Sequence, residues 1–267
     1  MRHPLEDNYR EMISITMHSK FKIKNIIIFV FWIIVWQILY MIVNEPLFLA
    51  GPFTTLKSLV KILKEGSTYG ILAKSIIKII GGFFLALVLA VFTAFLAWSK
   101  RIVRESLTPL MAFAKAVPIA SVIVLFLAWF SSSGISGFVA GFVAFPLVYF
   151  EILGALDDMD SKILEMLKVY GVPFLKRMRY VYLPAICDRL FVTIKIAVGM
   201  CIRAGVAAEL IGVPSFSIGE KLYKAKLYLE IGDLFAWTVV IVAAGYICEK
   251  VMVGMLKIIG RKVGSGK

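Results

Sequence analysis

A polar segment at residues 156–184 is the part of this sequence best suited to binding another protein. Acidic residues open the segment and basic residues close it: Asp157, Asp158, Asp160, Lys176, Arg177 and Arg179. The acidic residues are placed for the N-terminus of a helix, where negative charge is favourable. Apolar side chains then recur at helical spacing, at Ile163, Leu164, Leu167 and Tyr170. Gly171 can take the left-handed backbone that ends a helix, and Pro173 suits the first turn of another. We therefore expect two short helices joined by a tight corner, with charged and apolar surfaces for a protein partner.

Charged residues inside long apolar stretches form a second group. Arg203 and Glu209 share one such stretch, and ionisable groups at membrane depth usually face a cavity or a partner. Our hypothesis is that Glu209 lines or gates a solute path and that Arg203, deeper in the membrane, attracts an anion. A purely structural role explains each residue equally well. Lys115 is a further charge of this kind, and Pro118 and Pro146 interrupt apolar stretches, which favours bent, pore-lining helices.

The sequence offers no pattern for a metal site or for catalysis. Its three cysteines, Cys187, Cys201 and Cys248, lack paired or metal-like spacing. Its two histidines, His3 and His18, lie in a polar N-terminal stretch. The terminal GSGK lacks the earlier glycine of a phosphate-binding loop, because Arg261 stands at that position. We therefore expect that any use of ATP occurs on another chain.

The composition predicts an integral membrane protein. Of 267 residues, 60% are hydrophobic and 18% are charged, and apolar runs approach the roughly 20 residues needed to cross a bilayer. About six spans are expected, at 25–43, 71–98, 107–130, 135–153, 185–211 and 233–256. This gives an all-α bundle at 25–260, with an N-terminal cytoplasmic arm at 1–24 and a cytoplasmic tail at 261–267. In the fourth span, Gly137 and Gly141 form a G-x-x-x-G pattern that permits close packing of helices.

The distribution of positive charge predicts the orientation of these spans. The net charge is +13. If the N-terminus is cytoplasmic, the inner segments hold 17 lysines and arginines and the outer segments hold 6. This asymmetry is the one expected from the positive-inside rule, so both termini are predicted to be cytoplasmic. It also accounts for the basic character without a nucleic-acid partner.

The polar segment resembles the cytoplasmic signature of the permeases of ABC importers, E-A-A-x(3)-G-x(9)-I-x-L-P. Glu165 and Gly171 stand at the glutamate and the glycine, and Leu183 and Pro184 at the final pair. Val181 replaces the isoleucine, and the two alanines are replaced by Met166 and Leu167.

Other positions resemble the nitrate, sulfonate and taurine branch of these permeases. The branch pattern S-x-x-R-x-x-x-G-F is matched by Ser75, Lys78, Gly82 and Phe83, with lysine in place of arginine. Ala208 and Glu209 stand where the branch carries an Ala-Glu pair. The resemblance covers about residues 30–255 and weakens after Glu209.

The resemblance implies a type I importer permease in a prokaryotic inner or plasma membrane. Such a permease works as a dimer, here expected to be a homodimer, with ATPase subunits on the cytoplasmic side and a substrate-binding protein on the outer side. ATP and Mg²⁺ would bind to the ATPase, so this chain is expected to be neither an enzyme nor a holder of a cofactor. The coupling residues implied are Glu165, Met166, Leu167, Gly171, Leu183 and Pro184. The candidates for the translocation path are Arg203, Glu209, Lys78, Lys115, Pro118 and Pro146.

The solute remains open at this point. The branch favours a small anion such as a sulfonate or nitrate, and related machinery imports vitamin precursors of the pyrimidine, thiamine or riboflavin kind. A membrane scaffold and an integral-membrane enzyme are alternatives from other classes. The scattered acids and the position of the histidines speak against the enzyme.

Overall fold

In the computed structural model, which describes residues 24, 26–45 and 47–264, the elements are helical. A helix at Ile26–Val43 is followed by α2 (Pro52–Lys64), α3 (Gly66–Ser99), α4 (Arg101–Ala116) and α5 (Ile119–Trp129). A 3₁₀ turn (Ser132–Gly134) leads into α6 (Ile135–Asp157), and the polar segment forms α7 (Ser161–Val169) and α8 (Phe174–Arg177). A π-helical turn (Met178–Tyr182) continues into α9 (Leu183–Gly212), then α10 (Ile218–Leu227) and α11 (Ile231–Gly264).

The described helices confirm the predicted membrane bundle. Five are long and apolar enough to span a bilayer, namely Ile26–Val43, Gly66–Ser99, Ser132–Asp157, Arg189–Gly212 and Ile231–Met255. The bent pair α4 and α5 raises the number to six if it counts as one span. The predicted arm at 1–24 lies outside the described residues apart from residue 24, and α11 continues into the predicted tail as far as Gly264.

The third predicted span, 107–130, is wrong as a single helix. α4 ends at Ala116, α5 begins at Ile119, and the two helices meet at 103°. The break falls at Val117 and Pro118, which both have extended backbone. A proline disfavours helical geometry in the residue before it, so the predicted interruption at Pro118 is confirmed. At Pro146 the expectation of an interruption is wrong, because α6 runs through that residue without a break.

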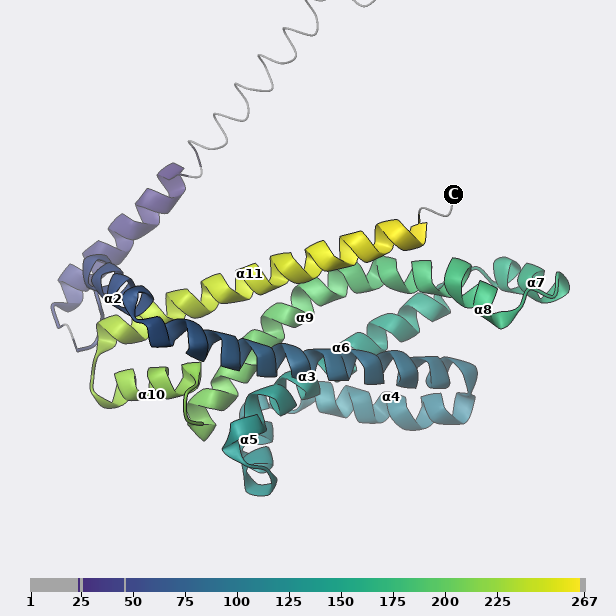
Figure 1. Cartoon of the computed structure of the whole chain (residues 1–267), viewed down its shortest axis with the longest axis horizontal. Coiled ribbons are helices and arrows are strands. Elements are labelled where there is room, and N and C mark those ends of the chain that lie inside the picture. The colour runs from purple at the N-terminus through teal and green to yellow at the C-terminus, as the bar shows by residue number, and fades with distance from the viewer. Residues whose placement is uncertain (1–23, 25, 46, 265–267) are drawn as a thin grey trace, which may run out of the picture.

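Small residues bring the central helices together. α6 packs against α3 and α9 over most of its length, and Figure 1 shows these helices running along the long axis of the molecule. A Cβ atom at Gly82 of α3 would lie 2.0 Å from the carbonyl oxygen of Gly137 in α6. One at Gly141 would lie 3.1 Å from the carbonyl oxygen of Gly82. The packing role predicted for Gly137 and Gly141 is therefore confirmed, since the two backbones touch where side chains are missing.

The two ends of the bundle carry different structures. In Figure 1, α7 and α8 lie at one end of the long axis, and α2 and α10 lie at the other. The helix Ile26–Val43 stands largely clear of the bundle, with many exposed apolar side chains. Its Trp36 Nε1–H donates to the carbonyl of Ala50 (3.0 Å), and the Trp36 ring stacks on Phe235 of α11.

Candidate functional site

Two arginine–aspartate pairs fix the base of the 156–184 segment. Asp157, the last residue of α6, accepts two hydrogen bonds from the guanidinium of Arg104 in α4, at 3.0 and 2.6 Å. Asp158, which follows it, pairs with Arg189 of α9. Three helices are therefore joined at the point where the segment leaves the bundle. Arg104 and Arg189 were not singled out from the sequence, where they read as ordinary basic residues near the membrane surface.

The expected position of the acidic cluster needs correction. Asp157 and Asp158 end α6, and only Asp160 caps the N-terminus of α7, where its carboxylate accepts the backbone N–H of Lys162 at 2.9 Å. Carboxylates are unfavourable at a helix C-terminus, because the carbonyl ends of the peptide dipoles gather there. The arginine partners offset that cost for Asp157 and Asp158.

Gly171 makes the tight corner that the sequence predicts. Its φ angle is +61°, in the left-handed region. The N–H of Gly171 donates to the carbonyl of Lys168, and the N–H of Val172 donates to the carbonyl of Leu167, each at 3.1 Å. These two bonds satisfy carbonyls at the end of α7 in the arrangement called a Schellman motif. Arg177 of α8 closes the corner by donating to the carbonyl of Val172 at 2.6 Å.

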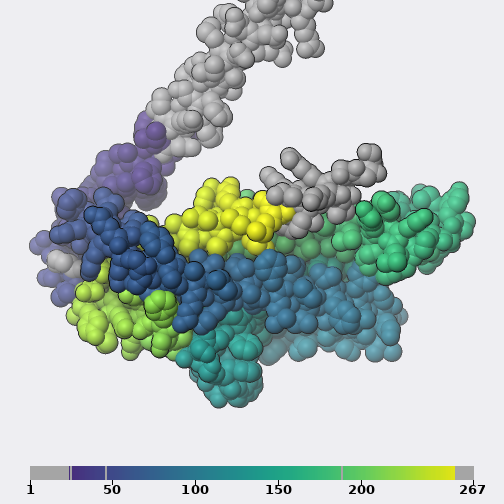
Figure 2. Space-filling view, viewed as in Figure 1, coloured from purple at the N-terminus to yellow at the C-terminus, as the bar shows by residue number. Residues whose placement is uncertain are grey.

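The segment beyond this base, α7 to α8, presents apolar side chains to solvent. Glu165 and Met166 are exposed, whereas Leu167 is turned inward and buried. The apolar side chains exposed on α7, the corner and α8 are Ile163, Met166, Val169, Tyr170, Phe174 and Leu175. We call these six residues the loop patch. Figure 2 shows the segment at the end of the bundle, and the exposure of the loop patch leaves it available to a partner. Exposed apolar patches with a charged rim usually mark sites of protein association.

Leu183 and Pro184 lie in the first turn of α9. The Leu183 side chain is exposed, and that of Pro184 is half-buried. The helical backbone runs from α8 through the π-helical turn into α9. The segment is thus joined to the interior of the bundle by nearly continuous helix.

Glu209 lies inside the bundle, at 1% exposure, where α3, α9 and α10 meet. Its carboxylate accepts the hydroxyl hydrogen of Ser75 (2.8 Å) and the backbone N–H of Gly219 (3.3 Å). The same Ser75 oxygen accepts the N–H of Ile218 (3.1 Å), so the N-terminus of α10 is held by side chains of two other helices. This placement supports the structural role that the sequence left open, because the Glu209 carboxylate does not reach a surface in this conformation.

Contacts within α10 complete this end of the bundle. Ser217 caps the helix by accepting the N–H of Glu220 (3.1 Å), and Glu220 accepts from Lys224 (2.7 Å). The hydrogen bond from Lys224 lowers the pKa of the Glu220 carboxyl below its ordinary value. The helix therefore starts at a defined residue, which the spacing of Ser217 and Glu220 in the sequence could have indicated.

Arg203 is exposed on the surface of the bundle at membrane depth. Its Nε–H donates to the carbonyl of Gly199, one turn earlier in α9, at 3.1 Å. Among the described residues, no ion pair to Arg203 is found. Lys115, in the last turn of α4, is also exposed, and its ammonium lies 5.9 Å from the ring centre of Phe150. Neither Arg203 nor Lys115 has an ion pair with Glu209 in the part of the chain that the structure describes.

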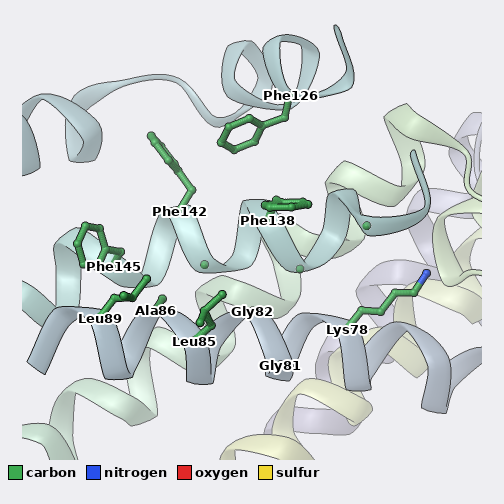
Figure 3. A pocket seen from close by; sticks show the side chains of 13 residues that line it. Lys78, Gly81, Gly82, Leu85, Ala86, Leu89, Phe126, Phe138, Phe142 and Phe145 are labelled. Atoms are coloured by element: carbon green, nitrogen blue, oxygen red, sulfur yellow. The ribbon is translucent and has the colours of Figure 1, made fainter. Parts of the chain in front are cut away.

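An apolar groove follows α3 and α6, with α5 above it. Its volume is about 480 Å³, and Lys78 is the charged residue that lines it. Figure 3 shows Lys78 at one end and the rings of Phe138, Phe142 and Phe145 further along. The Lys78 ammonium donates to the carbonyl of Ser133, in the turn between α5 and α6. Pro118, by contrast, is exposed at the break between α4 and α5, and Pro146 is buried in α6.

Comparison with known proteins gives a consistent result. Residues 82–265 match the family model described as the inner membrane component of binding-protein-dependent transport systems. A protein of Brucella melitensis named as a probable ABC transporter permease is 26% identical over 208 residues, which cover 76% of this chain and 83% of the relative. A relative with the same description from Brucella abortus is 26% identical over the same share of this chain and 82% of its own length. A protein of Methanocaldococcus jannaschii named as a putative ABC transporter permease is 22% identical over 91% of this chain and 93% of its own length.

Proposed function

Since the chain belongs to the family of inner membrane components of binding-protein-dependent transport systems, we propose that it is the permease of an ATP-driven importer. The family makes it an ABC transporter permease subunit, a multi-pass membrane protein that works with ATPase and substrate-binding partners. The proposal has four further parts: the transporter imports its solute, the permease is a homodimer, its termini are cytoplasmic in an inner or plasma membrane, and the solute is a small anion. The position of the loop patch carries the part of the proposal that concerns coupling to an ATPase.

The loop patch offers the chemistry that a docking ATPase requires. Val169 and Leu175 are 83% and 81% exposed, although both side chains are apolar. Water makes such exposure unfavourable, and burial against a partner removes the cost. The ion pairs at Asp157 and Asp158 hold the base of the segment against α4 and α9. A force applied to the segment would therefore reach the membrane helices.

Arg203 supports a charged pathway between two copies of the chain. A guanidinium at membrane depth without an acidic partner is costly against lipid, and such groups usually face a cavity or another subunit. In a homodimer, two copies of Arg203 would make a positive region that attracts an anion. We assign no direct contact with solute to Glu209, because it is buried at the start of α10.

Charge substitutions in the loop patch test the coupling role. Val169→Asp and Leu175→Asp should abolish co-purification of the ATPase and stop solute uptake, while the chain still inserts in the membrane. The matched control is Ile102→Asp in α4, where the apolar side chain is 79% exposed but lies outside the loop patch. Normal ATPase binding by both loop variants would refute the docking assignment.

Arg203 is tested by transport in proteoliposomes that contain the assembled complex. Arg203→Met should reduce uptake of an alkylsulfonate or nitrate without weakening ATPase binding, and Arg203→Lys should retain part of the uptake. Unchanged uptake by Arg203→Met, with normal folding, would remove the proposed attraction of an anion.

A further inference from the structure

The apolar groove beside Lys78 has the depth of one leaflet of a bilayer. Trp98 and Lys100 mark the membrane boundary on α3 at the end of the bundle that carries α7 and α8. From there, the twenty residues 79–98 extend about 30 Å, the thickness of a hydrocarbon core. Lys78 therefore lies at the opposite boundary. Leu89, the groove residue furthest along α3 from Lys78, is about 16 Å from it at the helical rise, close to the bilayer centre.

The lining of the groove changes from polar to apolar along this length. Lys78 and the turn at 131–134 stand at the boundary end. The hydroxyls of Ser131 and Ser133, 2.9 Å apart, are at this same turn. Towards the bilayer centre the walls are formed by leucine and phenylalanine side chains. Gly81 and Gly82 of α3 also line the groove.

The charge of Lys78 is not balanced by an acidic side chain. Among the described residues its ammonium has a hydrogen bond to a carbonyl oxygen and no ion pair. An ammonium has three donors, so two remain for an acceptor outside the chain. An anion at this point would meet a positive charge beside low-dielectric walls, where the attraction is strong.

We propose that this groove binds one phospholipid of the leaflet on the side of the 131–134 turn. The phosphate accepts hydrogen bonds from Lys78, and one acyl chain lies along the groove towards Leu89. The match between the groove's length and half a hydrocarbon core carries the assignment. A small hydrophilic anion would leave the phenylalanine walls without an apolar partner, whereas an acyl chain fills them.

The chain supplies two substitutions that should remove the lipid in different ways. Lys78→Gln removes the positive charge, and Gly81→Leu fills the groove. A Cβ atom at Gly81 meets nothing within 4 Å, so the leucine can be accommodated without displacing the backbone. Lys57→Gln, which changes an exposed lysine of α2 outside the groove, is the matched control for loss of charge.

Native mass spectrometry of the complex, purified in mild detergent from membranes of phosphatidylglycerol and phosphatidylethanolamine, gives the measurement. We expect the wild type and Lys57→Gln to retain a phospholipid mass. Lys78→Gln should lose about tenfold in retention, as expected for loss of a charge-assisted hydrogen bond, and Gly81→Leu should lose retention because its side chain occupies the space of the acyl chain. Equal retention in all four proteins would overturn the proposal, as would retention of inorganic phosphate in place of a lipid.

A photoreactive benzoylphenylalanine at Phe138 identifies the occupant directly. Phe138 lines the groove and is 48% exposed. An adduct with the mass of a phospholipid supports the proposal, and an adduct with a second copy of the chain overturns it. Absence of either adduct, with efficient photolysis, also counts against a bound lipid.

Discussion

The corner at Gly171 provides the sharpest test of the coupling segment, because it separates backbone geometry from contact. Its φ of +61° is unfavourable for any residue with a Cβ atom, by about 1–2 kcal/mol. A Cβ atom added there meets nothing within 4 Å, so packing adds no further penalty. The cost lowers the population of this corner, relative to other backbone conformations, by about 5- to 30-fold.

A graded series at this one position gives the expected order. Gly171→Asn should be mildest, since asparagine tolerates left-handed backbone, followed by Gly171→Ala and then by the β-branched Gly171→Val. Affinity for the ATPase, measured with the purified permease in nanodiscs, and ATP-driven uptake should fall in that order. The thermal midpoint of the membrane bundle serves as a control and should stay near the wild-type value. Equal affinity in all four proteins, or a loss that follows side-chain size with asparagine no better than alanine, would refute the reasoning.

Three other experiments test contacts within the bundle. Gly82→Ala should destabilise the bundle by about 1–3 kcal/mol, because its Cβ overlaps the backbone of α6. Gly81→Ala, whose Cβ meets nothing within 4 Å, is the control and should not destabilise it. Comparable thermal midpoints for the two variants would contradict the close approach of α3 and α6. Glu209→Ala should weaken the attachment of α10, because it leaves two buried donors without an acceptor, at a cost of about 1–3 kcal/mol each. The expected result is faster hydrogen exchange of the backbone amides at 213–230, with a smaller increase for Glu209→Gln. A double-mutant cycle of Arg104→Ala and Asp157→Ala should give a coupling energy below about 1 kcal/mol, because the pair is partly exposed; a value several times larger in denaturation experiments would show that the pair is more shielded from water than the structure indicates.

The sequence predicted the features that depend on length and local pattern. Apolar runs near 20 residues predicted the spans, and Gly171 with its neighbours predicted the corner, because each signal lies within one short stretch of chain. Gly137 and Gly141 predicted a close helix approach for the same reason. The direct packing partner of that pair, Gly82, lies in another helix and was noted only as part of a family pattern.

Features that depend on distant residues were not predicted correctly. The stretch 107–130 is apolar through most of its length, so hydropathy could not reveal the 103° bend, although Pro118 marked its position. The partner of Glu209, Ser75, is 134 residues away in the chain, so its burial depends on how three helices meet. Asp157 and Asp158 were assigned to the start of a helix because the sequence does not show where α6 ends.

The unbroken course of α9 gives the molecule a mechanical property. The thirty residues of α9 form one continuous helix, about 45 Å long along its axis and curved in Figure 1, with the π-helical turn at its cytoplasmic end under the proposed topology. If the helix rotates as a unit about that end by about 5°, its other end moves by up to roughly 4 Å, which would carry the attached α10 across the width of a water molecule. A small rotation at the cytoplasmic end of α9 thus produces a displacement of several ångströms at its other end, without a hinge within the helix.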